Sequence, residues 1–408
     1  MTSSYAVVGG GILGAAVARR LQEVDPDGTV TLWEKEDRLA AHQTGRNSGV
    51  VHAGLYYQPG SLKATLCRKG VGMLKEFCQG HGIRYDECGK VLVALDEVEE
   101  SRLGAIEEKA RANGVPGVRR LTGAELREIE PHVQGVAGLH SPTTAIVDFP
   151  GVTRRLADLV VADGGSVHLG TELVGIRQEP GGVWLRGRTA RGVREERFDR
   201  VVLCTGLHAD HTAAQAGDDP EPKVVPFRGE YYLLRPDRRD LVNGLIYPVP
   251  DPRYPFLGVH MTPRVDGEVM VGPNAVLALA REGYTWGTVS ARDLREIAAY
   301  SGFRRFARQH WRTGAAEMAG SLSKRRFVAA ARRYVPELRT EDVVAGPSGI
   351  RAQTLQPDGS LVDDFLISTQ GAVTALRNAP SPAATSSLAI AEHLVDAMLG
   401  RTSEAGAR

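Results

Sequence analysis

Tyr5-Ala-Val-Val-Gly-Gly-Gly-Ile-Leu-Gly14 is the stretch of sequence that decides the fold. A short apolar run enters a glycine-rich turn, and Ala15-Ala-Val-Ala-Arg-Arg-Leu21 then has the apolar periodicity of a helix. Thr29-Val-Thr-Leu-Trp33 is β-rich, and Glu34 follows it. The order strand, glycine turn, helix and strand predicts a βαβ unit at the N-terminus.

Gly9, Gly11 and Gly14 give this unit the spacing of a dinucleotide-binding turn. Gly9 permits the tight turn, Gly11 lets the backbone approach a pyrophosphate, and Gly14 allows close packing of helix on strand. The start of the helix offers free N–H groups to phosphates. Glu34 is placed to accept hydrogen bonds from ribose hydroxyls and argues against NADP. NAD and FAD stay open at this point, and the alternative is a glycine turn without a nucleotide.

Composition indicates an ordinary globular protein. The 408 residues predict two or three folding units, and 42% hydrophobic with 24% charged residues excludes wholesale disorder or a fibre. Fifty Lys and Arg against 49 Asp and Glu give no general reason to bind nucleic acid. The four cysteines lack a C-x-x-C pair, so we expect reduced thiols and no metal. No apolar run is long enough for a membrane span or a signal peptide, so we expect a cytoplasmic protein, with peripheral membrane association left open.

The βαβ rhythm is interrupted twice along the chain. Residues 61–80 indicate a helix, residues 89–95 a strand, and Thr122-Gly-Ala-Glu125 a capping box. Later runs indicate a strand at 361–367, a helix at about 381–399 and a frayed tail at 401–408. We therefore expect an α/β plus α+β protein. A Rossmann-type cofactor domain (1–82, 150–218 and 345–408) is interrupted by a mixed-sheet substrate-binding domain (83–149 and 219–344).

The loop after the first βαβ unit favours FAD over NAD. It reads Ala41-His-Gln-Thr-Gly-Arg-Asn-Ser-Gly-Val-Val-His-Ala-Gly54 and is polar and punctuated by glycines. An extended flavin needs a second set of contacts here, whereas an NAD enzyme would continue with the next helix and strand. The alternative for this loop is an ordinary solvated connection.

Further stretches complete a recognisable pattern. They are Gln43-Thr-Gly-Arg-Asn-Ser-Gly-Val-Val-His52, Pro226-Phe-Arg-Gly-Glu-Tyr-Tyr232, Pro255-Phe-Leu-Gly-Val-His-Met-Thr-Pro263, Gly349-Ile-Arg-Ala-Gln353 and Asn378-Ala-Pro-Ser-Pro-Ala-Ala-Thr-Ser-Ser-Leu388. In this order they resemble the L-2-hydroxyglutarate oxidase/dehydrogenase family of D-amino-acid-oxidase-like FAD enzymes. The resemblance implies FAD-dependent oxidation of L-2-hydroxyglutarate to 2-oxoglutarate. We expect oxygen or a quinone as electron acceptor, and a soluble carrier stays open. His208 departs from the family, where we expect glutamine.

The expected cofactor-binding residues come from the glycine turn, the polar loop and the last segments of the cofactor domain. The stretch before the last helix is expected to bring a positive helix end to the reduced flavin. Val174 is carried over from the family pattern as a backbone contact to the adenine. The full set is Gly9, Gly11, Ile12, Leu13, Gly14, Glu34, Lys35, Thr44, Arg46, Asn47, Ser48, Gly49, Val174, Thr205, Gly206, Gly349, Arg351, Pro380, Ser381, Ala383, Ala384 and Thr385.

The expected catalytic residues follow from the implied dicarboxylate substrate. Arginine suits a carboxylate because its guanidinium binds both oxygens, and we expect Arg351 in this role, with Arg228 as a second candidate that could instead pair with Glu230. A neutral histidine suits the hydroxyl proton, so His52 and His260 are both candidates. The Arg-rich run Lys324-Arg-Arg326 indicates a solvated helix face or a weak contact with an anionic membrane.

Two other functions stay open at the level of sequence. One is an FAD-dependent amine or amino-acid oxidase of the same fold, since a fold does not fix a function. The other is a protein that binds FAD without catalysis.

Overall fold

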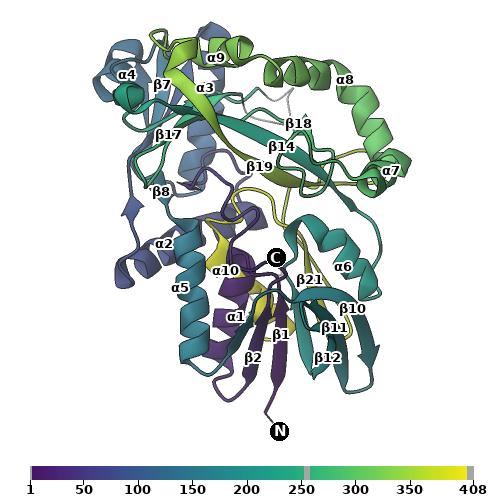
Figure 1. Ribbon diagram of the computed structural model, residues 1–408. Coiled ribbons are helices and arrows are strands. Elements are labelled where there is room, and N and C mark those ends of the chain that lie inside the picture. Colours follow the sequence, from purple (N-terminus) through teal and green to yellow (C-terminus); the bar gives the residue numbers. More distant parts are fainter. Residues whose placement is uncertain (1, 252–257, 402–408) are drawn as a thin grey trace.

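The computed structural model describes residues 2–251 and 258–401. Its lower half in Figure 1 is built on a six-stranded sheet in which the strands are parallel except for β20 at one edge. In spatial order the strands are β20 (Leu366–Gln370), β21 (Val373–Asn378), β13 (Arg200–Leu203), β1 (Ser4–Val8), β2 (Thr29–Trp33) and β9 (Ser166–His168).

Apolar side chains on both faces of this sheet explain its layers. On one face α1 (Ile12–Val24) packs against α5 (Phe149–Ala162) and α10 (Ser387–Met398), and α2 (Leu62–Gly80) packs on α10. On the other face Trp33 and Val201 pack with the antiparallel meander of β10 (Glu172–Glu179), β11 (Gly182–Thr189) and β12 (Gly192–Phe198). Parallel strands covered on both sides need apolar side chains on both faces, as β1 and β2 have.

The upper half is built on a nine-stranded mixed sheet. The two long strands β14 and β19 run through it together and extend down toward the first sheet (Figure 1). Its strands are β18 (Val276–Leu277), β14 (Lys223–Leu234), β17 (Val269–Gly272), β16 (His260–Pro263), β15 (Leu245–Pro248), β5 (Lys90–Ala94), β7 (Ala137–Ser141) and β6 (Arg119–Thr122), with β19 (Val343–Leu355) paired to β14.

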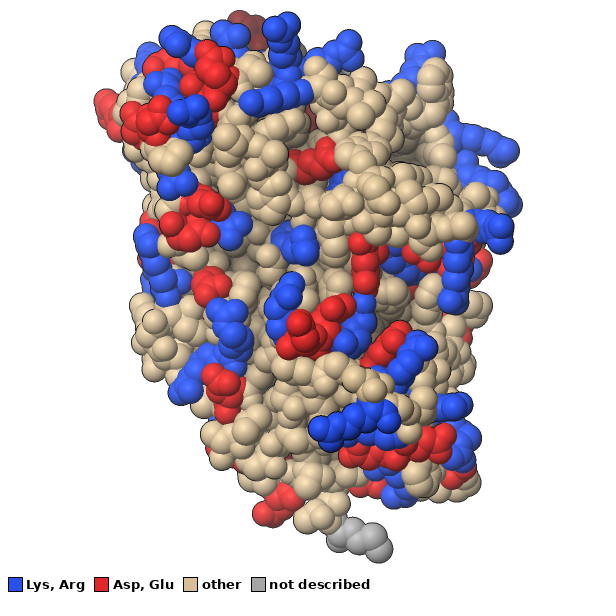
Figure 2. Space-filling view, in the orientation of Figure 1, with Lys and Arg blue, Asp and Glu red and all other residues tan. Residues whose placement is uncertain are grey.

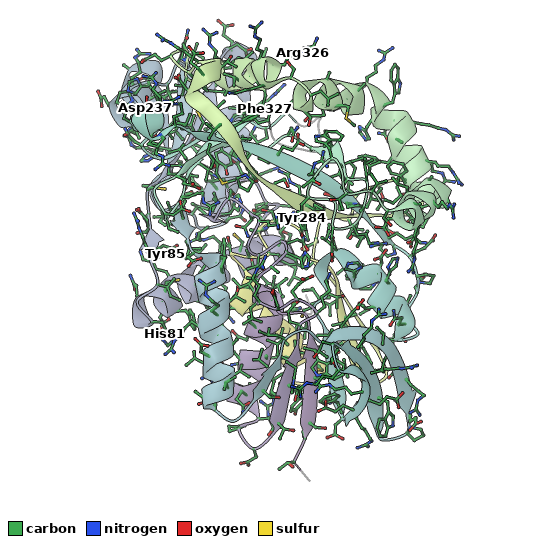
Figure 3. The ribbon with its side chains drawn as sticks, in the orientation of Figure 1. His81, Tyr85, Asp237, Tyr284, Arg326 and Phe327 are labelled. Atoms are coloured by element: carbon green, nitrogen blue, oxygen red, sulfur yellow. The ribbon has the colours of Figure 1, made fainter. Side chains whose placement is uncertain are left out.

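Helices cover the faces of this second sheet. Phe327 of α9 (Lys324–Arg332) packs on Tyr232 of β14 with their ring centres 4.8 Å apart, whereas the adjacent Arg326 is exposed at the outer edge (Figure 3). The other helices of this half are α3 (Glu97–Ala112), α4 (Gly123–Ile129), α7 (Ala291–Ala299) and α8 (Ser301–Ser321). None of the helices within the described ranges has both the length and the apolar character needed to cross a bilayer.

Short elements connect the two halves. The three-stranded sheet of β3 (Val50–Val51), β8 (Ala145–Val147) and β4 (Tyr85–Asp86) joins segments that are distant in sequence. The remaining elements are α6 (Ala209–Gln215) and the 3₁₀ helices η1 (Gly206–His208), η2 (Pro236–Leu241) and η3 (Thr340–Asp342).

The predicted βαβ unit is confirmed as β1, α1 and β2, and the helix predicted at 61–80 is confirmed as α2. The capping box is also confirmed, because the Thr122 hydroxyl accepts from the N–H of Glu125 while the Glu125 carboxylate accepts from the N–H of Thr122. The predicted tail lies outside the described residues except for Arg401.

Two predicted elements begin in the wrong place. The strand predicted at 361–367 begins at Leu366, because the Asn378 side-chain amide takes the carbonyls of Val362 and Asp364 that a strand neighbour would otherwise use. The helix predicted from about 381 begins at Ser387, after a series of turns. Proline disfavours helical geometry in the residue before it, so Ser381, which precedes Pro382, is not helical.

The division into two domains stays a prediction, and two of its boundaries need to move. The boundary at residue 150 separates Phe149 from the rest of α5 and moves by one residue. The boundary at residue 345 falls inside β19, which pairs with β14 from residue 343 to residue 355. We therefore propose to assign all of β19 to the substrate-binding domain. The boundaries near residues 82 and 218 fall between elements.

Candidate active site

A cavity of about 1310 Å³ extends from the glycine turn of the first sheet to the strands of the second sheet. It gathers most of the residues predicted from the sequence. Those that line it are Gly9, Gly11, Ile12, Leu13, Glu34, Lys35, Thr44, Arg46, Asn47, Ser48, His52, Thr205, Gly206, His260, Gly349, Arg351, Pro380, Ser381, Ala383, Ala384 and Thr385. The predicted residues that do not line it are Gly14, Gly49, Val174 and Arg228.

The glycine turn has the geometry of a phosphate cradle. Gly9 has φ +112°, and a Cβ there would lie 2.3 Å from the carbonyl oxygen of Cys204. A Cβ on Gly14 would lie 1.8 Å from the carbonyl oxygen of Gly9, so Gly14 serves the packing of α1 on β1 rather than the cavity. A Cβ on Gly11 has a single close neighbour, the Thr44 hydroxyl at 3.1 Å, so this position is open on the cavity side.

Glu34 is fixed at the end of β2 by backbone hydrogen bonds. One carboxylate oxygen accepts from the N–H of Gly10 at 2.6 Å, and the other accepts from the N–H of Glu36 at 2.8 Å. The residue is 7% exposed and lines the cavity. Each oxygen keeps a further lone pair, so the carboxylate can still accept from a ribose hydroxyl.

The polar loop after β2 is folded on itself rather than solvated. The Asn47 side chain donates to the carbonyls of Gln43 and Thr44 and accepts from the N–H of Gly49. A Cβ on Gly349 would lie 2.2 Å from the carbonyl oxygen of Arg46, so glycine lets β19 approach this loop. Gly49 thus supports the loop, while Arg46, Asn47 and Ser48 line the cavity.

Val174 does not line the cavity, although Thr171, Glu172 and Leu173 do. The register of β10 against β11 shifts between Leu173 and Gly175, which marks Val174 as the extra residue of a β-bulge. The predicted adenine contact through its backbone therefore stays a prediction.

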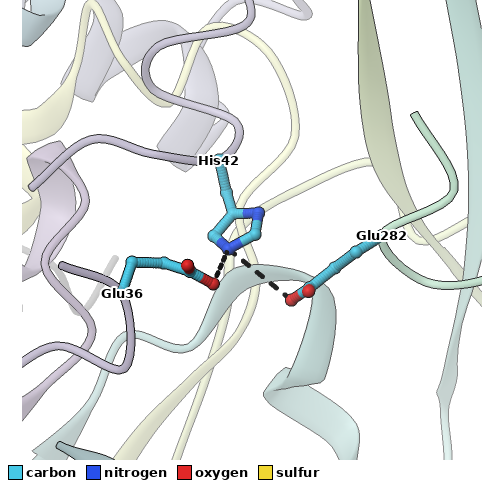
Figure 4. A group of neighbouring side chains, drawn as sticks. All are labelled: Glu36, His42 and Glu282. Atoms are coloured by element: carbon cyan, nitrogen blue, oxygen red, sulfur yellow. Dashed lines mark hydrogen bonds and ion pairs between the residues drawn. The ribbon is translucent and has the colours of Figure 1, made fainter. Parts of the chain in front are cut away.

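An ion-pair cluster at the cavity wall was not predicted from the sequence. His42 lies 2.9 Å from Glu36 and 3.7 Å from Glu282 (Figure 4), and Lys35 and His208 also contact Glu282. Burial acts to raise the pKa of Glu282, but hydrogen bonds from His208 and Lys35 outweigh it and lower the pKa to about 2. The cluster ties the segment after β2 to a loop about 245 positions away, and the short acidic and basic run after Glu34 was its one local signal.

His260 is held in a defined tautomer at the opposite end of the cavity. Its Nδ1 lies 3.0 Å from the carbonyl oxygen of Gly258, which can only accept, so Nδ1 carries the hydrogen and Nε2 keeps a lone pair. Its ring stacks on Tyr247 with ring centres 4.0 Å apart. Burial lowers the pKa of His260 to about 3, and the charge of Arg351 acts in the same direction.

His52 lies at the same end of the cavity. Its backbone N–H donates to the Thr385 hydroxyl at 3.1 Å, which joins the polar loop to the turn before α10. Burial lowers the pKa of His52 to about 3, and the charge of Lys90 lowers it further. Both imidazoles are therefore neutral near pH 7.

The structure does not place Arg228 at the cavity. Its guanidinium is fully buried, lies 3.1 Å from the Glu230 carboxylate and is 4.1 Å from the centre of the Trp286 ring. Successive side chains of a strand point to opposite faces, and the next residue, Gly229, lines the cavity. The expected contact with substrate is therefore corrected to an ion pair behind the wall. Arg351 does line the cavity.

Two buried lysines near the histidines were missed. Lys63 lines the cavity and donates to the backbone carbonyl of Asp363 at 2.8 Å and to its carboxylate at 2.9 Å. Lys90 is 1% exposed on β5. Its signal in the sequence was a charged residue inside an otherwise apolar strand.

Comparison with known proteins identifies the family. Residues 4–397 match the family model described as FAD dependent oxidoreductase. The chain belongs to this family. The predicted FAD cofactor, the Rossmann-like fold and the oxidoreductase class are thereby confirmed.

Curated relatives of this FAD-dependent oxidoreductase align over nearly its full length. A protein of Escherichia coli K12 named L-2-hydroxyglutarate dehydrogenase is 44% identical over 96% of this chain and 92% of its own. A human mitochondrial protein of the same name is 43% identical over 97% of this chain and 89% of its own.

The fold is shared with solved structures. The L-alpha-glycerophosphate oxidase of Mycoplasma pneumoniae with FAD bound superimposes with a TM-score of 0.79, covering 98% of this chain and 95% of that chain at 21% identity. At that identity the likeness shows the fold alone. The cradle at Gly11, the carboxylate of Glu34 and the adjoining cavity fit an FAD dinucleotide in this chain.

Proposed function

We propose that this FAD-dependent oxidoreductase oxidises L-2-hydroxyglutarate to 2-oxoglutarate. Relatives that align over nearly the whole chain carry that activity in their names. The observation that carries the proposal is the meeting of a neutral histidine and an arginine at one end of the cofactor cavity. His260 presents an Nε2 lone pair there, and the charge of Arg351 is close enough to lower the pKa of His260.

In this reaction the substrate hydroxyl loses a proton. The hydrogen on C2 leaves together with two electrons, as a hydride. Bound FAD supplies the two-electron acceptor. The glycine turn and Glu34 would hold its pyrophosphate and ribose, and the stretch 378–385 would lie along it. The chain's own contribution at the substrate end is to take the proton and to fix the carboxylates.

His260 is our choice as proton acceptor. Because the Gly258 carbonyl fixes the hydrogen on Nδ1, Nε2 is free to accept the hydroxyl proton. The stacked ring of Tyr247 fixes the plane of the imidazole. His52 keeps the alternative role, since it lines the same cavity and is equally neutral.

Arg351 is our choice for the carboxylate next to C2. A guanidinium donates two parallel hydrogen bonds to one carboxylate and so fixes the orientation of the substrate. Arg351 lies on β19 opposite Phe227 of β14, in the part of the ladder that precedes its register shift after Glu230, and this pairing holds the backbone. A rigid strand suits a residue that must set the position of C2.

The specificity of this site is tested by the ratio of kcat/KM values for related hydroxy acids. L-2-hydroxyglutarate should exceed lactate and malate by roughly 10-fold to above 100-fold, because a cation left unpaired in a desolvated site costs that much. Lactate lacks the second carboxylate, and malate carries it one carbon closer. An equal kcat/KM for lactate would contradict the proposal.

We also propose that the electrons pass on to oxygen or a quinone, and that the enzyme touches an anionic membrane through α8 and α9. Basic side chains dominate the edge of the molecule over α7 and α8 (Figure 2). Trp311 of α8 is 62% exposed, with the Arg312 guanidinium 5.4 Å from its ring centre, and Leu322 is 72% exposed shortly before the exposed Arg325 and Arg326 of α9. Exposed apolar groups among basic ones suit the interface of an anionic bilayer.

Sedimentation with vesicles tests the membrane proposal. The enzyme should sediment with vesicles that contain anionic lipid and remain unbound with neutral ones, and Arg325→Glu with Arg326→Glu should abolish the binding. Equal binding of the wild-type and double-variant proteins would overturn it.

A further inference from the structure

Lys90 is a buried cation that the proposed chemistry does not yet use. It is 1% exposed in β5, between Gly89 and an apolar run. Within residues 2–251 and 258–401, no carboxylate lies within ion-pair distance of its ammonium. Buried charges are normally paired or neutralised, so an unpaired buried lysine is a costly feature that a purely structural role does not explain.

The ammonium sits directly behind the wall of the substrate end. Its Nζ lies 4.9 Å from the ring centre of Tyr56 and 4.9 Å from that of Tyr247. Both tyrosines line the cavity, and Tyr247 stacks on His260. The hydroxyl of Tyr56 is buried and has no hydrogen-bond partner among the described residues. Tyr56 thus combines a buried hydroxyl that has no partner among the described residues with a ring that faces the Lys90 ammonium.

Lys63 differs from Lys90 in how its ammonium is satisfied. Lys63 is also buried beside this cavity, but the backbone carbonyl and the carboxylate of Asp363 satisfy its ammonium. Both ammoniums face aromatic rings, Lys63 that of Tyr57 at 5.3 Å, but Lys63 has the carboxylate of Asp363 as well, and no carboxylate of the described residues pairs with Lys90. The missing negative charge must come from a molecule that enters the cavity, or the amine must be neutral.

We propose that Lys90 is a positioning residue for the second carboxylate of a doubly charged substrate. It acts through Tyr56 and Tyr247 rather than by contact, while Arg351 holds the first carboxylate. Rings present a negative face to the ammonium and hold it in place, and a buried charge acts over several ångströms where water is excluded. This inference rests on the proposed function and names the source of its preference for a dicarboxylate.

A pH profile can report the charge of Lys90. Burial lowers the pKa of Lys90 to about 7, while the neighbouring thiol of Cys67 acts to raise it. The histidine pKa values lie at about 3, burial raises the pKa of Cys67 to about 12, and burial raises the tyrosine pKa values too. The titratable groups that interact with Lys90 are His52, Tyr56, Cys67, Tyr247 and His260, and the charges of Lys63 and Arg351 act on the same two histidines. Of Lys90, His52, His260, Cys67, Tyr56 and Tyr247, Lys90 alone changes charge between about pH 5.5 and about pH 9.

Two substitutions of Lys90 test the proposal through KM. Lys90→Met should raise KM for L-2-hydroxyglutarate by roughly 10-fold, the effect of a charge pair about 10 Å apart at an effective dielectric constant of about 20. It should leave KM for L-2-hydroxypentanoate, which has a methyl group in place of the second carboxylate, unchanged. Wild-type KM for the dicarboxylate should rise above about pH 7, and Lys90→Arg should keep it low at about pH 9 because arginine stays charged.

A binding measurement separates this role from a structural one. Glutarate, which cannot be oxidised at C2, should raise the Tm of the wild-type holoenzyme more than that of Lys90→Met, and the Tm of Lys90→Met without ligand should not fall. Lys75→Met is the matched control, because Lys75 makes an exposed pair with Glu87 away from the cavity, and it should keep both the wild-type KM and the wild-type ligand shift.

Three outcomes would overturn the inference. One is a Lys90→Met protein that keeps its preference for the dicarboxylate. Another is an equal loss of kcat on both substrates in Lys90→Met and Lys90→Arg, which would indicate a proton-transfer role. The last is a Lys90→Met protein with a lowered Tm, which would identify Lys90 as structural. If wild-type enzyme is not reduced by L-2-hydroxyglutarate but glutarate still stabilises it through Lys90, the proposed function fails and this inference stands.

Discussion

The two histidines of the cavity differ in how the chain holds them. The imidazole of His260 is fixed by a carbonyl and a stacked ring, whereas His52 contacts Thr385 through its backbone N–H. His260→Gln should therefore lower the rate of flavin reduction by roughly 10²–10⁴-fold with FAD still bound, because glutamine cannot accept the hydroxyl proton. The rate is measured by anaerobic stopped-flow absorbance.

His52→Gln is the matched comparison for His260→Gln. The backbone hydrogen bond to Thr385 survives this change, so FAD should stay bound and the rate should fall less. If both variants keep the wild-type rate from about pH 5 to about pH 9, no histidine takes the proton. Loss of FAD from His52→Gln would show that His52 helps to bind the cofactor.

The same histidines set an acid limit on stability. Each has a pKa of about 3 in the fold against 6.5 ordinarily, so between these values the unfolded chain binds protons that the folded chain does not. Each should lower the unfolding free energy by about 1.4 kcal/mol per pH unit as the pH falls from 6.5 toward 3. Urea unfolding of the holoenzyme at several pH values measures the slope, and each His→Gln variant should flatten it. A slope that both variants keep would assign the acid sensitivity to other groups.

Arg351 should show a binding defect rather than a chemical one when it is replaced. Arg351→Lys replaces a planar guanidinium, which donates two parallel hydrogen bonds, with a single point charge. KM should therefore rise more than kcat falls. Steady-state kinetics with L-2-hydroxyglutarate measure both. A fall in kcat with unchanged KM would argue that Arg351 acts only in the transition state.

The glycine turn between β1 and α1 makes a prediction at the scale of an element. Gly11→Val should fold but lose FAD, since a side chain there meets little protein and fills the cradle. Gly14→Ala should destabilise the protein itself, because its Cβ would lie 1.8 Å from the carbonyl oxygen of Gly9. Bound flavin absorbance and Tm, compared for the two variants, separate the effects. Full flavin occupancy in Gly11→Val would mean that the turn has been misinterpreted.

Elements with a strong local pattern could be predicted, and elements fixed by distant contacts could not. The β1–α1–β2 unit and the capped helix α4 carry their signals within a few residues. The start of β20 depends on Asn378, whose amide takes carbonyls more than ten positions earlier. The role of Arg228 depended on which face of β14 it occupies, which the sequence alone does not state.

The candidate site shows the same limit at the scale of the whole molecule. Residues within recognisable motifs could be predicted, and most of them line the cavity. Glu282 and Lys90 lie outside those motifs and reach the cavity wall through the packing of two sheets. Tyr284 is another residue that reaches the cofactor side through this packing (Figure 3). Its hydroxyl lies 2.7 Å from Nδ1 of His42, and its ring centre lies 3.9 Å from the Arg46 guanidinium.

The Glu282 cluster makes a prediction about the two halves together. Glu282→Gln removes the charge that Lys35, His42 and His208 share, so the loop should hold the cofactor side less firmly. The Tm should fall by a few degrees at neutral pH and FAD should dissociate faster. The lowered pKa of Glu282 also means that its contribution is lost as the pH falls from 4.5 toward 2, where wild type and variant should converge. An unchanged Tm and FAD release rate at neutral pH would contradict this role.

The central claim is that the cavity oxidises one enantiomer of a 2-hydroxy dicarboxylate. An anaerobic spectral titration of the purified yellow protein with both enantiomers of 2-hydroxyglutarate tests it most directly. L-2-hydroxyglutarate should bleach the flavin and D-2-hydroxyglutarate should not. Bleaching by glycine, sarcosine or a D-amino acid, with none by L-2-hydroxyglutarate, would contradict the claim.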